Sequence, residues 1–200
     1  MLKVTASAVA LILLAACQAE NRSGLPETET TGTAQSVQET STASATTTGE
    51  SGGTLSAMTP ADKEFVVKAG MGGLYEVQAG NLALQNASSP AVRSFAQRVV
   101  TDHSKANAEL AQLATAKGVA LATELTGEHE AAVDHLATLS GAEFDKAYMQ
   151  HMVADHAKDV AEFEKASTSA TDADLKGWAG RTLPILREHA KLANELAGKV

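Results

Sequence analysis

Apolar residues recur every three or four positions through most of residues 60–197, the spacing of helices that bury one face. No segment of the sequence shows the strict alternation that marks a half-buried strand. The pattern therefore predicts an all-α domain. We expect four long helices, which begin at Thr59-Pro60, Ser89-Pro90, Ser140 and Thr171, and a shorter helix from Thr126 to about Leu139.

The helix starts and the connections define the expected arrangement. A hydroxyl side chain followed by proline is a typical helix start, and Ser140 with Glu143 forms a capping-box pattern. Short connections join the first two and the last two long helices, which makes each pair antiparallel neighbours, whereas residues 118–139 are long enough for a crossover. These features predict a ferritin-like four-helix bundle over residues 58–200, with an extra short helix in the crossover.

The inward positions of these helices are mostly small. Alanine and glycine occupy many of them, so the helices can approach closely while each contact buries little apolar area. Stability then depends on a few large side chains, namely Phe65, Phe95, Phe144, Phe163, Trp178 and the leucines. On the first helix the expected inward residues are Phe65, Ala69, Gly72, Glu76, Ala79 and Ala83.

The start of the chain has the composition of an export signal. Lys3 precedes an apolar stretch that is too short to span a bilayer. This stretch ends in Leu14-Ala15-Ala16-Cys17, which matches the lipobox of bacterial lipoproteins, and the chain has no other cysteine. We expect residues 1–16 to be removed and Cys17 to be lipidated; the alternative is an ordinary secretory signal with an incidental cysteine. Gln18, which is not aspartate, favours an outer-membrane lipoprotein that faces the periplasm.

Residues 17–57 differ in composition from the rest of the chain. They are rich in Thr, Ser, Gly, Ala and Glu and include no aromatic residue, so they cannot bury enough apolar area to offset the entropy of ordering. We expect a disordered tether between Cys17 and the bundle. The net charge of -8 argues against a nucleic-acid partner, because phosphate binding needs a basic surface. The expected partner is the membrane, through the lipid anchor, and the sequence points to no particular protein partner.

One pattern of eleven residues occurs three times, each time with a histidine. Its shared form is apolar-x-acid-His-x-Lys-x-x-x-Glu-apolar, and the histidines are His103, His156 and His189. On a helix the two apolar ends lie on the side of the histidine, whereas the acid, the lysine and the glutamate lie on the other flank. The pattern predicts three inward histidines and a solvent-facing ladder of charges.

Glu76 adds an inward carboxyl on the first helix, and two interpretations follow. The first is a metal site with Glu76, His103, His156 and His189 as ligands, a set that suits zinc, iron or copper. The second is a hydrogen-bonded histidine network that fixes the helix register. Counting residues from the connections places Glu76 level with His103 to within about 5 Å. His189 falls nearer the level of Tyr148–Met152, so counting does not decide between the two.

The acidic residue beside each histidine has a limited role in either interpretation. Asp102, Asp155 and Glu188 point about 100° away from their histidines, which makes them poor co-ligands from the same helix. They are able to act instead as hydrogen-bond acceptors for a ligand on another helix.

Other patterns of catalytic or metal-binding residues are weak. The residues of Tyr148-Met149-Gln150-His151-Met152 suit copper, although methionine at helical spacing is more often core. His129 and His135 are expected at the surface of the short helix. No Ser-His-Asp spacing, phosphate loop or reactive cysteine stands out, so we predict no catalytic residue. The di-iron signature needs a glutamate three residues before each histidine, but those residues are Val100, Val153 and Leu186.

Several motifs of the chain are those of a known family. They are Phe95-Ala-Gln-Arg-Val-Val-Thr-Asp102-His103-Ser, Ser140-Gly141-x-x-Phe144-Asp145-x-x-Tyr148, Val153-x-Asp155-His156 and Leu183-Pro184-x-Leu186-x-x-His189. With them, residues 60–198 resemble a bacterial ferritin-like family, the domain of unknown function 4142, whose members are often labelled outer-membrane proteins. The resemblance implies a ferritin-like bundle and an envelope location, and it implies no activity. The family's recurrent histidines match His103, His156 and His189.

The sequence therefore predicts a lipid-anchored helical bundle that acts as a non-catalytic envelope or stress-related binding module. The alternative is a metal-binding protein that uses the inward glutamate and histidines, and a metalloenzyme of the ferritin-like type is a third hypothesis. The binding-module and metal-binding hypotheses differ in the expected position of the histidines. Side chains that converge on one point indicate a metal site, whereas histidines spread along the bundle indicate a scaffold.

Overall fold

The computed structural model describes residues 58–200, so the predicted signal peptide, Cys17 and the tether lie outside the described residues. Within this range the chain forms helices and no strand, which confirms the all-α prediction. No helix in the described range is both long enough and apolar enough to cross a membrane. The helices are α1 (Pro60–Asn86), α2 (Pro90–Ala116), α3 (Gly127–Ala137), α4 (Gly141–Ser169) and α5 (Ala173–Ala197).

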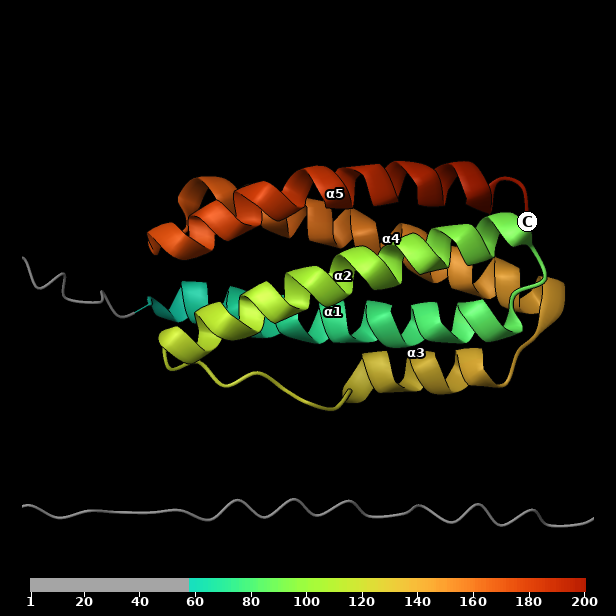
Figure 1. The fold of residues 1–200 in the computed structure, drawn as a ribbon, viewed down its shortest axis with the longest axis horizontal. Helices are drawn as coiled ribbons and strands as arrows, with labels where there is room; N and C mark the ends of the chain where they lie inside the picture. Colours follow the sequence, from blue (N-terminus) through green and yellow to red (C-terminus); the bar gives the residue numbers. More distant parts are fainter. Residues whose placement is uncertain (1–57) are drawn as a thin grey trace, which may run out of the picture. The chain divides into compact units, whose positions relative to one another are not determined.

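The four long helices form a bundle of two antiparallel hairpins. Helix α1 pairs with α2 and α4 pairs with α5, and the hairpins pack together through α1 against α4 and α2 against α5. The connection from α2 to α4 runs back along the bundle and includes α3, which packs against α1 and α4 (Figure 1). Helix α4 therefore runs in the same direction as α2, and the predicted crossover is confirmed.

The helix starts follow the sequence signals in two cases and depart from them in three. Thr59 Oγ1 accepts a hydrogen bond from the Asp62 N–H at 3.1 Å, and Ser89 Oγ caps α2 in the same way. Thr126 and Ser140 occupy the N-cap positions of α3 and α4, but their side chains make no capping hydrogen bond. The N-cap of α5 is Asp172 rather than Thr171, because the carboxylate of Asp172 accepts from two N–H groups of the first turn.

Two buried aspartates connect the hairpins at opposite ends of the bundle. Asp145, in the first turns of α4, accepts hydrogen bonds from Ser88 N–H, Ser88 Oγ–H and Ser89 N–H in the α1–α2 connection. Asp62, in the first turn of α1, accepts from the N–H groups of Thr171 and Asp172 in the α4–α5 connection. Each hairpin thus satisfies backbone donors of the other, which would otherwise be left without partners.

The apolar core consists of two clusters, one toward each end of the bundle. One cluster contains Phe95, Phe144 and Tyr148, and the other contains Phe163 and Trp178. Residues of both clusters occur on each of the four long helices. On α1 the buried residues differ from the prediction: Val66 and Tyr75 are buried, whereas Phe65 and Ala69 are partly exposed and pack against the edge of a cluster.

Candidate metal centre

A layer of polar residues lies between the two apolar clusters, with one residue from each long helix. The exposed fractions of Glu76, His103, His156 and His189 are 0%, 6%, 0% and 0%. The ring centroids of the histidines are 5.3 to 5.7 Å apart. One ring nitrogen from each histidine lies within 4.8 Å of the other two. The three histidines therefore converge on one point, as the metal interpretation requires.

The convergence of His156 and His189 corrects the residue count, which placed them at different levels. His156 lies thirteen residues before the end of α4, and His189 lies sixteen residues after the start of α5. A Cα–Cβ bond tilts toward the N-terminus of its helix. The His156 side chain thus leans away from the α4–α5 connection and the His189 side chain leans toward it, which closes an offset of about 4.5 Å along the axis.

Hydrogen bonds orient two of the imidazole rings. His156 Nδ1–H donates to the Met152 carbonyl at 3.0 Å, and His189 Nε2–H donates to Asp102 Oδ2 at 2.9 Å. The remaining nitrogens, His156 Nε2 and His189 Nδ1, are buried and have no hydrogen-bond partner. Because the opposite nitrogen of each ring holds the proton, these two nitrogens carry free lone pairs inside the buried layer. This is the arrangement found for histidines that bind metal ions.

Glu76 lies against two of the histidines without a hydrogen bond to either. Its Oε2 is 2.7 Å from His103 Nδ1 and its Oε1 is 3.2 Å from His156 Nε2, yet both oxygens lack a partner of hydrogen-bond geometry. Burial raises the pKa of Glu76 to about 8. Burial also lowers the pKa of His103 to about 4 and lowers the pKa values of His156 and His189. The imidazoles are therefore neutral at pH 7, the form that binds metals.

The acidic residues of the repeated pattern are not all part of a solvent-facing ladder. Asp102 on α2 is the acceptor for His189 on α5, and Arg98 Nε lies 3.6 Å from the same carboxylate oxygen. Asp155 is half-buried, and its carboxylate groups with those of Glu76 and Asp159 within 4.8 Å. The ladder prediction is wrong for these two aspartates, while Glu188 is on the surface and binds Arg98.

Sequence reasoning missed Asp159 and Arg98. Asp159 lies three residues after His156 and four after Asp155, so helical spacing places it on a neighbouring face of α4. This spacing could have identified Asp159 from the sequence. No sequence pattern identifies Arg98, because its contacts depend on how α2 packs against α5.

The methionines of the alternative copper motif do not join the histidines. Met149 and Met152 are fully buried within the apolar cluster that contains Tyr148. His151 instead lines a surface pocket between α1, α3 and α4, together with His129 and Tyr75. The Tyr75 ring centroid lies 5.0 Å from that of His129 and 6.5 Å from that of His151. His135 is exposed, as expected.

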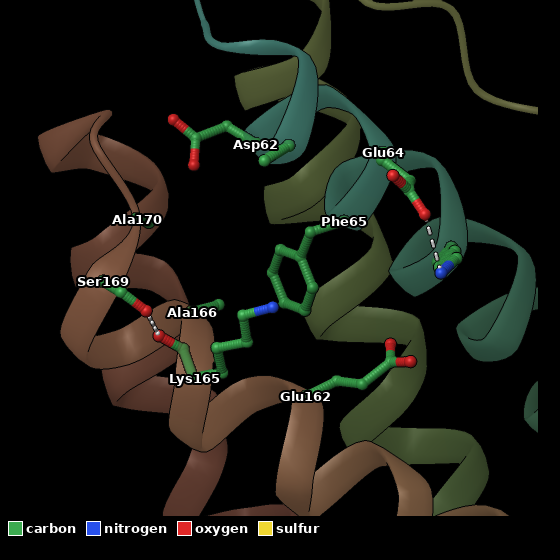
Figure 2. Close-up of a pocket in the computed structure, with 10 residues that line it drawn as sticks. Asp62, Glu64, Phe65, Glu162, Lys165, Ala166, Ser169 and Ala170 are labelled. Carbon is green, nitrogen blue, oxygen red and sulfur yellow. Dashed lines mark hydrogen bonds and ion pairs between the residues drawn. The ribbon is translucent and has the colours of Figure 1, made fainter.

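A second surface groove lies between the start of α1 and the end of α4 (Figure 2). Phe65 lies in its centre with the Lys165 side chain directed toward the ring, and Glu64 pairs with Lys68 at 2.9 Å. The groove shares no residue with the histidine layer. Charges of both signs line it, and the groups of potential metal ligands among residues 58–200 all lie elsewhere.

The bundle is similar to solved structures of low sequence identity. A crystal structure of a DUF305 fragment from Deinococcus radiodurans matches with a TM-score of 0.63 and 16% identity, over 72% of this chain and 99% of that chain. CopM matches in its Cu(I)-bound and Cu(II)-bound forms, each with a TM-score of 0.59 and 16% identity, over 69% of this chain and 96% of CopM. At this identity the likeness shows the fold alone.

No curated protein matches the sequence. A family model described as domain of unknown function, DUF4142, matches residues 45–196, which is more than half of the chain. The chain therefore belongs to the DUF4142 family.

Proposed function

We propose that this protein binds a transition-metal ion in the middle of the bundle. His103, His156 and His189 are the ligands, and Glu76 is the fourth. One observation carries the proposal: three neutral imidazoles from three helices bring ring nitrogens within 4.8 Å of one another in the core. Metal–nitrogen bonds of about 2.0–2.1 Å require each nitrogen to move inward by less than about 1 Å. Rotation of the side chains supplies a movement of this size.

The ligand set favours copper or zinc. Imidazole binds both, and three histidines with a carboxylate suit zinc in a four-coordinate site. The similar fold of CopM, which is described in copper-bound forms, makes copper the first metal to test. Iron is less favoured, because the residues that precede the histidines do not supply the glutamates of di-iron proteins.

The crossover topology supports assignment of the bundle to the ferritin-like folds. Two antiparallel hairpins joined by one long connection, with α2 and α4 parallel, are the arrangement of that group. In the ferritin-like metal proteins, as in the site proposed for this chain, ligands from all four helices meet in the bundle core. In this chain the ligands are mostly histidines rather than glutamates.

Metal analysis tests the proposal directly. The full chain is stripped with chelator, loaded separately with Zn²⁺, Cu²⁺ and anaerobic Cu⁺, and desalted. We expect about one tightly held ion in the histidine layer, and a loss of affinity of at least about a hundredfold in His103→Ala and His189→Ala. His135→Ala is the matched control, because His135 is an exposed histidine outside the layer. Substoichiometric loading with all three ions contradicts the proposal.

We also propose that the protein is attached to the outer membrane by lipid on Cys17 and faces the periplasm. The support is the lipobox, Leu14-Ala15-Ala16-Cys17, and the position of Cys17 as the sole cysteine. Two acyl chains give a far stronger hold on the membrane than one. In a bacterial host, Cys17→Ser should move the protein from the membrane fraction to the soluble fraction and abolish labelling by a fatty-acid probe. Persistent labelling of the serine variant contradicts the anchor.

A further inference from the structure

Three carboxyl groups meet beside the histidine layer, on the side where α1 packs against α4. Glu76 comes from α1, and Asp155 and Asp159 come from α4. One oxygen from each lies within 4.8 Å of the other two. The carboxylate of Asp159 lies beside Gly72 of α1. Glu76 belongs to this group and to the histidine layer at the same time.

Lys158, in the adjacent pocket, exerts a favourable charge interaction on Asp155 and Asp159 without forming an ion pair with either. Among the described residues, no lysine or arginine forms an ion pair with Glu76, Asp155 or Asp159. Both oxygens of Glu76, a side chain with 0% exposure, lack a hydrogen-bond partner, and so does the buried Oδ2 of Asp155. An unpaired carboxylate is costly to bury, so each of these groups either takes up a proton or binds a cation.

Asp155 also connects the carboxyl group to the surface. It lines the pocket between α1, α3 and α4, together with Glu128, His129 and His151. The mouth of this pocket thus offers two carboxylates, two imidazoles and the ammonium group of Lys158. Asp155 therefore belongs both to the wall of this pocket and to the carboxyl group that includes Glu76.

We infer that Glu76, Asp155 and Asp159 form a second cation site, which takes a divalent ion that prefers oxygen ligands and shares Glu76 with the histidine site. The inference rests on the proposed function for the role of Glu76 as a bridge between two ions. Oxygens that lie within 4.8 Å of one another can reach an ion at about 2.1–2.4 Å if each moves by less than about 1 Å. Bridged pairs of ions in proteins are about 3.5–4 Å apart, which a single carboxylate spans.

Mn²⁺ is the probe for the second site, because it prefers carboxylate oxygen to imidazole more strongly than zinc does. Mn²⁺ is titrated into the full chain, both metal-free and loaded with one equivalent of Zn²⁺, and free Mn²⁺ is followed by electron paramagnetic resonance. We expect one Mn²⁺ per zinc-loaded chain. In Asp155→Asn/Asp159→Asn, Mn²⁺ affinity should fall at least tenfold while the zinc equivalent is retained. Asp134→Asn, an exposed aspartate on α3, is the matched control and should bind like the wild type.

The outcomes separate this inference from the proposed function. Equal Mn²⁺ affinity in the wild type and the double variant overturns the second site, even if zinc is bound. Absence of zinc binding overturns the histidine site. In that case the Mn²⁺ titration of the metal-free chain tests whether the three carboxyl groups bind an ion without zinc. The double variant should fold, because asparagine keeps the shape of aspartate and removes repulsion between carboxylates. If its melting temperature is nevertheless lower than that of the wild type, Asp159→Asn alone provides the same comparison.

Discussion

At the scale of single residues, Asp102 orients the imidazole ring of His189. Its carboxylate on α2 accepts the Nε2 proton of His189 on α5 and thereby fixes which nitrogen of that ring is free. Arg98 lies 3.6 Å from the same oxygen and also binds Glu188, so the carboxylate is itself held in place. The hydrogen bond to Asp102 therefore fixes both the tautomer and the orientation of the His189 ring.

Asp102→Ala should therefore weaken metal binding without removing a ligand. Loss of such an orienting partner typically lowers metal affinity about 10–100-fold. A competition titration with a chromophoric chelator measures the change, with Asp134→Ala as the control for loss of an aspartate at an exposed position. If Asp102→Ala binds as tightly as the wild type, the bond to His189 has no part in the site.

At the scale of helices, the buried aspartates explain how two hairpins with small inward residues keep one register. Asp145 and Asp62 each reach from the start of one hairpin into the connection of the other. They hold opposite ends of the bundle. The histidine layer lies between these ends, so its geometry depends on both contacts.

Asp145→Ala should lower the free energy of unfolding by about 2–4 kcal/mol, because three donors near Ser88 lose a charged acceptor. Urea unfolding followed by circular dichroism measures the change. Asp134→Ala removes an aspartate that is exposed on α3 and should change the free energy by less than about 0.5 kcal/mol. A similar small effect in Asp145→Ala would contradict the role of this carboxylate.

The start of α5 should contribute a stability that depends on pH. Burial alone would raise the pKa of Asp172, but the ion pair with Lys117 at 2.7 Å and the N–H groups of the first turn outweigh it and hold the pKa below its usual value. A depressed pKa stabilises the fold above the unfolded value, about 3.9, and this contribution is lost as pH falls through the folded pKa. Asp172→Asn should therefore melt below the wild type at pH 7, and the difference should shrink toward pH 3. A difference that is constant with pH contradicts the argument.

The sequence predicted the helices well and the site incompletely, for physical reasons. Helical period and Pro60 and Pro90 placed α1 and α2, because these signals are local. The convergence of the histidines depends on the direction of the side chains along antiparallel helices, which a count of residues omits. The partnership of Asp102 with His189 depends on contacts between helices, which one helix cannot reveal.

At the scale of the whole molecule, a polar layer interrupts the core where apolar packing would be more favourable. The clusters on either side are apolar, and the layer between them contains a carboxyl and three imidazoles. Because Glu76 and the free imidazole nitrogens lack hydrogen-bond partners, the layer costs stability in the absence of a cation. Such a cost is typical of a binding site rather than of a scaffold.

Because of this cost, we expect replacement of Glu76 to raise the stability of the metal-free protein and to weaken metal binding. In the metal-free full chain, Glu76→Leu should raise the free energy of unfolding, by up to about 4 kcal/mol, because a side chain of similar size no longer buries an unsatisfied carboxyl. The same variant should lose the increase in melting temperature that Zn²⁺ produces in the wild type, since binding to the folded state alone is what raises it. Thermal melts with Zn²⁺ and with chelator measure both effects, and Glu76→Gln, which keeps a polar group, should show the smaller gain in stability. If leucine destabilises the metal-free protein more than glutamine does, the layer contributes to folding in its own right, and the histidines and Glu76 are a scaffold.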